Sequence, residues 1–203
     1  MALADAIDRR HRMLVLLAVF ASLRWGELMG LRKTDFDLTL GLVQVERAVS
    51  LVGARQLIKN PKTPAGVRTI ALPMWLLPDL EQHFSDYSEQ TSDGRVFVGP
   101  TGVTPLRANF SRIWTRALAK AGITGIHVHD LRHTGNHLAA VSGASTRELM
   151  GRMGHVSVNA ALVYQHRTAS RDRAIADSLD AMVAELKAEG SDGSGHVGGT
   201  ATG

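Results

Sequence analysis

Hydrophobic and polar positions divide the chain into helical ends and a strand-rich middle. Ala4 to Phe20 has a helical pattern that is apolar on every side from Leu14 onward, which predicts a buried N-terminal helix. A second short helix is expected from Leu23 and ends near residues 31–35. Strand-forming segments separated by Gly-containing turns then predict a small antiparallel sheet, with strands at residues 42–49, 55–59 and 67–72.

Helical periodicity returns after the sheet. Residues 73–84 predict a helix. The overlapping stretch from Asp79 to Gly94 carries five acidic side chains and neither Lys nor Arg, so we expect it to face away from a polyanion. We also expect much of that stretch to be a loop.

The clearest amphipathic helix is Arg107–Ala121. Its apolar side chains recur at core spacing, at Phe110, Ile113, Trp114, Ala117 and Leu118, while Arg112, Arg116 and Lys120 form a basic stripe on the opposite side. The stripe is suited to contact phosphates, and an ordinary solvated helix face explains it equally well.

Further helices are expected from Leu131, from Ser145 with Glu148 as its capping box, from Ser157 and over Arg171–Ala188. The last of these has an apolar face, made of Ile175, Leu179, Met182, Val183 and Leu186. Beyond it the chain is rich in Gly, Ser and Thr, so we expect one domain over residues 1–188 and a disordered tail over 189–203. The predicted fold class is α+β, mainly α-helical, with a small three-stranded antiparallel sheet.

Composition narrows the class of partner. The 203 residues are 44% hydrophobic, enough for one globular core, and 23 basic against 19 acidic side chains leave a formal charge of +4. A basic balance favours a polyanionic partner. With no cysteine, disulfides and thiolate metal sites are excluded. Met13–Ser22 is too short to span a membrane, so the expected location is the cytoplasm.

The residues best suited to chemistry lie between His127 and His166. This stretch contains His129, Arg132, His133, His155 and Tyr164. Arginine binds a phosphate through paired hydrogen bonds, histidine transfers protons near neutral pH, and tyrosine forms a phosphoester when cations surround its phenol. Together these groups suffice for phosphoryl transfer without Mg²⁺ or another cofactor.

A metal site is the alternative for the histidines. His129, His133 and His137 are spaced four residues apart, which suits ligands on one helix face. No Glu, Asp or Cys completes the set at ligand spacing, so we expect no metal here.

Four segments in a fixed order resemble the signature stretches of the tyrosine recombinase, or phage integrase, family: Ala21–Leu28, His129–Thr134, Met153–His155 and Val163–His166. The nine residues from His155 to Tyr164 match the family's usual spacing. Asn60–Thr63 looks like the turn that presents the family's catalytic lysine. The resemblance covers about Ala4 to Leu186.

The resemblance implies a role for each residue. Arg24 and Arg132 would clamp the scissile phosphate, and Lys62 would protonate the leaving 5′ oxygen. His129 would act on the phenol's proton or donate to the phosphate, and His155 would add a further hydrogen bond. Tyr164 would attack to form a 3′-phosphotyrosyl link. Glu27 and His133 would have supporting roles, and Glu27 would orient Arg24 or the histidines. The alternative for Glu27 is an ordinary ion pair at the protein surface. The other tyrosine, Tyr87, lies among acidic residues and is no competitor.

The implied function is site-specific recombination on a double-stranded DNA attachment site, by a homotetramer assembled through the C-terminal helix. The apolar face of that helix fits packing on its own core equally well. Members of the family carry core-binding and arm-binding domains before the catalytic one, and these are expected to be absent here. Two alternatives remain: a DNA-binding fragment without activity, and a type IB topoisomerase, whose pattern fits the stretches around Lys62 and His155 less well.

Overall fold

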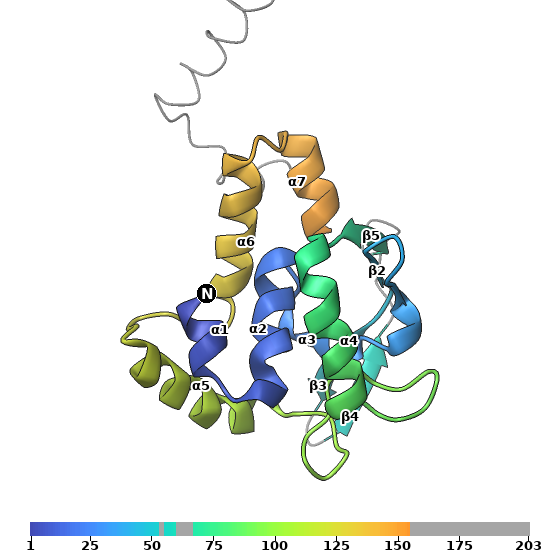
Figure 1. Ribbon diagram of the computed structural model, residues 1–203, viewed down its shortest axis with the longest axis vertical. Helices are drawn as coiled ribbons and strands as arrows, with labels where there is room; N and C mark the ends of the chain where they lie inside the picture. The colour runs from blue at the N-terminus through green and yellow to red at the C-terminus, as the bar shows by residue number, and fades with distance from the viewer. Residues whose placement is uncertain (53–54, 60–66, 155–203) are drawn as a thin grey trace, which may run out of the picture. The chain divides into compact units, whose positions relative to one another are not determined.

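The computed structural model describes residues 1–52, 55–59 and 67–154. Its helices are α1 (Ala2–Ala6), α2 (Arg9–Phe20), α3 (Trp25–Gly30), α4 (Leu77–Asp86), α5 (Arg107–Ala121), α6 (Asp130–Val141) and α7 (Thr146–Met153). Its strands are β1 (Phe36–Asp37), β2 (Leu42–Val45), β3 (Ala48–Val52), β4 (Arg55–Lys59) and β5 (Arg68–Ala71). Figure 1 shows the strands gathered beside α3 and α4. The predicted α+β class, mainly helical with a small antiparallel sheet, is confirmed.

The N-terminal helix is interrupted, so the prediction of one helix from Ala4 to Phe20 is wrong. α1 ends at Ala6, and Asp8 begins α2 by accepting a hydrogen bond from the backbone N–H of Arg10 at 2.9 Å. A short acidic side chain satisfies a free N–H at a helix start, which is why the chain restarts here. The apolar run Met13–Ala18 is buried, as predicted. Among the described residues, no helix is long and apolar enough to cross a membrane.

The predicted strand at residues 42–49 is in fact two strands in two different sheets. β2 lies between β1 and β5 in a three-stranded antiparallel sheet, while β3 pairs with β4 in a two-stranded sheet. The register joins Val43 to Ile70 in the first sheet. Arg47 lies between β2 and β3 in the sequence, and its guanidinium binds the buried Asp35, with Nη1 at 2.8 Å from Oδ1. The three-stranded sheet therefore contains the very short β1, which the pattern did not predict, instead of β4.

The acidic stretch from Asp79 to Gly94 is helical in its first half, because α4 continues to Asp86. Residues 87–94 are neither helix nor strand, so the expected loop is found in the second half of the stretch. Three of its five carboxylates are paired with arginines from outside the stretch, in the pairs Arg12–Asp79, Arg95–Glu89 and Arg32–Asp93. These internal ion pairs offset much of the negative charge. Which way the stretch faces relative to a polyanion stays a prediction.

α5 has the bounds and the faces that its periodicity predicts. Phe110, Trp114 and Ala117 are buried against the core, and the indole Nε1 of Trp114 donates to the carbonyl of Ile126 at 3.0 Å. The helix ends at Gly122, whose φ of 67° is readily adopted by glycine.

α6 and α7 lie side by side and follow one another closely in sequence (Figure 1). The predicted capping box is present: the Ser145 N–H donates to Glu148 Oε2 at 2.6 Å, and the Glu148 N–H donates to Ser145 Oγ at 3.3 Å. α6 packs closely on α2 at Gly135. A Cβ there would lie 1.9 Å from the Val19 carbonyl oxygen, so only glycine permits this approach. The helices expected from Ser157 and over residues 171–188, and the tail, lie outside the described residues.

Candidate active site

Glu27 is the centre of the candidate site. It lies in the first turn of α3, and its carboxylate receives paired hydrogen bonds from the Arg68 guanidinium, at 3.1 Å from Nη1 to Oε1 and 2.9 Å from Nη2 to Oε2. The Arg24 N–H also donates to Oε2, at 2.8 Å. Because only 9% of the Glu27 side chain is exposed, the alternative of an ordinary surface pair is wrong.

The electrostatic balance at Glu27 favours the charged carboxylate. Burial raises its pKa, but the hydrogen bonds and positive charges of Arg68 and Arg24 outweigh burial, and the net pKa is lowered. Glu27 is therefore an ionised carboxylate inside the fold, and it holds arginine side chains in place.

Arg24 presents its guanidinium at the start of α3. The backbone of Arg24 is extended, and its Nη1 donates to Glu27 Oε1 at 3.0 Å while 42% of the side chain remains exposed. A guanidinium has five N–H donors, so this contact, the one hydrogen bond that the Arg24 side chain donates within residues 1–52, 55–59 and 67–154, leaves donors for an external anion. α3 approaches β3 closely at Gly26, where a Cβ would lie 2.5 Å from the Val49 carbonyl oxygen.

Arg132 reaches the same carboxylate from α6. Its Nη1 is 3.9 Å from Glu27 Oε2. Nη1 also donates to the Ser22 carbonyl, and Nη2 donates to the Met153 carbonyl at 2.6 Å. Only 4% of the Arg132 side chain is exposed. Two arginines that are far apart in sequence, Arg24 and Arg132, thus converge on one buried carboxylate.

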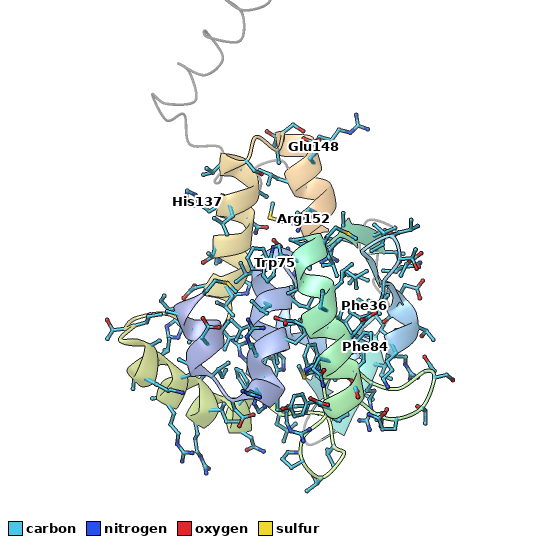
Figure 2. All side chains as sticks on the ribbon, viewed as in Figure 1. Phe36, Trp75, Phe84, His137, Glu148 and Arg152 are labelled. Carbon is cyan, nitrogen blue, oxygen red and sulfur yellow. The ribbon has the colours of Figure 1, made fainter. Side chains whose placement is uncertain are left out.

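His129 and His133 lie next to each other at the start of α6, with ring centroids 4.8 Å apart. Desolvation, followed by the positive charges of His133 and Arg132, lowers the pKa of His129 below its ordinary value. His129 is therefore neutral at physiological pH and able to accept a proton. His137 is labelled in Figure 2, further along α6 on the side away from α7. No group of three or more potential metal ligands is found in the part of the chain that the structure describes.

Three predicted catalytic residues, Lys62, His155 and Tyr164, lie outside the described residues. His155 and Tyr164 come after Gly154, the last described residue, which has a φ of 61° and terminates α7. The structure thus brings Arg24, Arg132 and Glu27 together, with His129 at the start of the same helix as Arg132. The roles of all six predicted catalytic residues stay predictions.

Two further arginines belong to this site, and the sequence analysis missed them. Arg68 in β5 binds Glu27 and also donates from Nε to the Arg152 carbonyl at 2.9 Å. Arg152, labelled in Figure 2 at the end of α7, donates to the carbonyls of Phe20 and Ala71, to Ala71 at 3.4 Å. The available signal was the placement of Arg68 at an inward position of a strand, next but one to Ile70.

The basic stripe of α5 is exposed, as expected. Arg112, Arg116 and Lys120 all lie at the surface. Arg116 and Lys120 also line a surface hollow shared with Arg10 and His11 from α2. No described contact joins the stripe to Glu27, so its role in binding DNA stays a prediction.

The fold and the paired guanidinium groups define a mainly helical α+β domain with a site suited to a phosphate-like anion. Residues 1–171 match the model of the phage integrase family, and the chain belongs to that family. It is 38% identical over 181 residues to a putative prophage phiRv2 integrase of Mycobacterium tuberculosis, and 32% identical over 181 residues to the integrase of Mycobacterium phage L5. Both alignments cover 87% of this chain and 48% of the relative, so the chain spans about half the length of these relatives.

Solved structures give the same fold. An integrase of the Tn1549 transposon, solved in complex with circular intermediate DNA, superposes with a TM-score of 0.71 at 22% identity, covering 83% of this chain and 59% of that one. XerA recombinase superposes with a TM-score of 0.66 at 23% identity, covering 87% of this chain and 59% of that one. The tyrosine recombinase catalytic-domain fold inferred from the four sequence segments is confirmed.

Proposed function

We propose that this chain is the catalytic part of a site-specific DNA recombinase of the integration and excision type, and that it cuts and rejoins a strand through Tyr164. The observation that carries the proposal is the convergence of Arg24 and Arg132 on the buried Glu27. An enzyme that cleaves a phosphodiester without a metal needs fixed cations where negative charge develops. The family membership and the DNA complexes of related integrases and recombinases support the same conclusion.

Arg24 and Arg132 bind the non-bridging oxygens of the scissile phosphate in this proposal. Arg24 already points an exposed guanidinium outward while Glu27 holds it from behind. The Arg132 side chain is more buried, so it contributes mainly its positive charge, together with any guanidinium N–H that faces the phosphate. Guanidinium groups stay protonated at every physiological pH, so the clamp needs no activation.

The covalent step exchanges one phosphoester for another. The Tyr164 phenolate oxygen attacks phosphorus, the bond to the 5′ oxygen breaks, and the products are a 3′-phosphotyrosyl link and a 5′ hydroxyl. Neutral His129 accepts the phenolic proton, Lys62 donates a proton to the 5′ oxygen, and His155 donates a hydrogen bond to the phosphate. Because the phosphoester bond energy is conserved, the reverse reaction reseals DNA without ATP.

The partner is a double-stranded DNA attachment site, held by phosphate contacts that include Arg112, Arg116 and Lys120. A homotetramer forms on that DNA through the C-terminal helix. Because the chain spans about half the length of its relatives, the whole reaction requires whatever the other half of such proteins supplies.

The test is covalent trapping on nicked DNA. The chain, together with a core-binding domain supplied as a separate polypeptide, is mixed with nicked 50-base-pair duplexes tiled over the DNA that flanks its coding sequence. Complexes that survive denaturing electrophoresis are then counted. We expect trapping by the unmodified chain, in EDTA as well as in Mg²⁺, and none by Tyr164→Phe. Tyr87→Phe is the matched control and should trap normally, because that ring packs beside His83 and Arg10 in the described fold.

Each other outcome contradicts a part of the proposal. Trapping by Tyr164→Phe would show that another nucleophile acts, and loss of trapping in EDTA would show that a metal is required. DNA binding without trapping would favour the alternative of a DNA-binding fragment that lacks activity.

A further inference from the structure

Arg68 joins three parts of the site with one buried side chain. It rises from β5, pairs with both oxygens of Glu27 in α3, and donates to the last turn of α7 through the Arg152 carbonyl. Only 6% of its side chain is exposed. The contacts use different nitrogens of one guanidinium, so the direction to each partner is fixed by the planar group.

Arginine side chains form several hydrogen bonds at the end of α7. Arg68 donates a hydrogen bond to the Arg152 carbonyl, and Arg132 donates one to the next carbonyl, that of Met153. The Arg152 side chain in turn binds the ends of α2 and β5. The residue after this clamp is Gly154, and His155 follows it directly in the sequence.

Stability alone does not account for so many buried arginines. Taking ion pairs out of water costs free energy that their mutual attraction often fails to repay, and apolar side chains of the same volume are often as good or better. Arg152 adds a further cation close to Arg68: desolvation first, and then the charge of Arg68, lowers the pKa of Arg152. A functional need for defined geometry explains the arrangement.

We propose that Arg68 is a positioning residue for phosphodiester cleavage: it fixes the carboxylate that orients Arg24 and the helix end that leads to His155. The inference rests on the proposed function. It assigns to β5 the task of coupling the arginine clamp to the α7 end, two parts of the site that are distant in sequence. Arg68 itself does not contact the DNA in this arrangement.

The test is single-turnover cleavage of the same nicked duplexes at saturating concentration by Arg68→Lys and Arg68→Gln. Lysine keeps the charge facing Glu27 but cannot bind both carboxylate oxygens and the Arg152 carbonyl together. Glutamine removes the charge and reaches one acceptor. We expect the cleavage rate constant per active molecule to fall by about 10- to 100-fold in both variants, as for other residues that orient a functional group. The DNA concentration that gives half-saturation should stay within about two-fold of the value for the unmodified chain.

The amplitude of the reaction gives the number of active molecules, so it separates a loss of folded protein from a slower cleavage step. A matched control adds a second check. Ile70→Val shortens the next inward side chain of β5, which is 2% exposed and pairs with Val43 of β2 in the sheet register. It lowers the melting temperature, but we expect its cleavage rate constant to stay unchanged. A purely structural Arg68 would behave like Ile70, with fewer active molecules that each cleave at the normal rate.

The double variant Arg68→Lys with Glu27→Gln adds a second measurement. If Arg68 acts through Glu27, the combined loss in rate is smaller than the product of the two single losses. Multiplicative losses, normal rate constants per active molecule, or an Arg68→Lys and Arg68→Gln pair that yields no folded protein would each overturn the proposal. Failure of the unmodified chain to trap DNA would instead refute the proposed function.

Discussion

Glu27→Gln is the sharpest test of the site's electrostatics. The substitution keeps the shape of the side chain and removes its charge, leaving the cations of Arg68 and Arg132 buried, at 6% and 4% side-chain exposure. Removing one partner of a buried pair costs about 3–5 kcal/mol, and since the amide oxygen still accepts one hydrogen bond we expect about 3 kcal/mol of lost unfolding free energy. Urea unfolding at pH 7.5 measures this loss.

The matched control is Asp93→Asn, which makes the same chemical change in an exposed pair with Arg32. Exposed ion pairs contribute little, so this variant should unfold almost like the unmodified chain. The pKa of Glu27 is lowered in the fold, so its stabilisation is complete above its unfolded value of 4.5 and is lost as pH falls through the folded pKa. The difference between Glu27→Gln and the unmodified chain should therefore shrink in acid. Equal losses for the two substitutions at pH 7.5 would refute the claim that Glu27 is a buried counter-ion.

Three further predictions use other parts of the fold. Burial lowers the pKa of His83 to about 4, so the stabilisation by its neutral ring is complete above pH 6.5, and about 2 kcal/mol of unfolding free energy should be lost between pH 7 and pH 5. His83→Leu should reduce this dependence of the unfolding free energy on pH in urea titrations, and an unchanged dependence would contradict the prediction. The lowered pKa of His129 places the acid limb of the cleavage rate below pH 6.5, and His133→Gln should move that limb to higher pH in stopped-time assays, since a neighbouring cation is removed. Gly135→Ala should destabilise by about 1–3 kcal/mol through its clash with a carbonyl of α2, whereas Gly151→Ala, with open space around it, should stabilise by about 0.5–1 kcal/mol in thermal melts; the reverse order would contradict the packing described.

Local patterns in the sequence predicted those parts of the fold that depend on near neighbours. α5 has its predicted bounds because its amphipathic pattern and its C-terminal glycine both depend on residues within the helix itself. The Ser145–Glu148 capping box likewise involves residues only three apart. The same local reasoning failed at Asp8, where one acidic side chain ends one helix and begins another without disturbing the apolar period. It failed again near Arg47, where adjacent segments belong to different sheets and the Arg47 side chain pairs with Asp35.

The sequence by itself determined the family, because the catalytic residue types recur in a fixed order with fixed spacing. It named Arg24, Arg132 and His129, and it placed Glu27 three residues from Arg24 without showing that the carboxylate is buried. Only the tertiary structure decided that Arg68 completes the cluster, since a bond between β5 and α3 spans 41 residues and leaves no periodic trace along the chain. The physical reason is general: helix and strand periods report which face is apolar, whereas a buried ion pair depends on how distant elements pack.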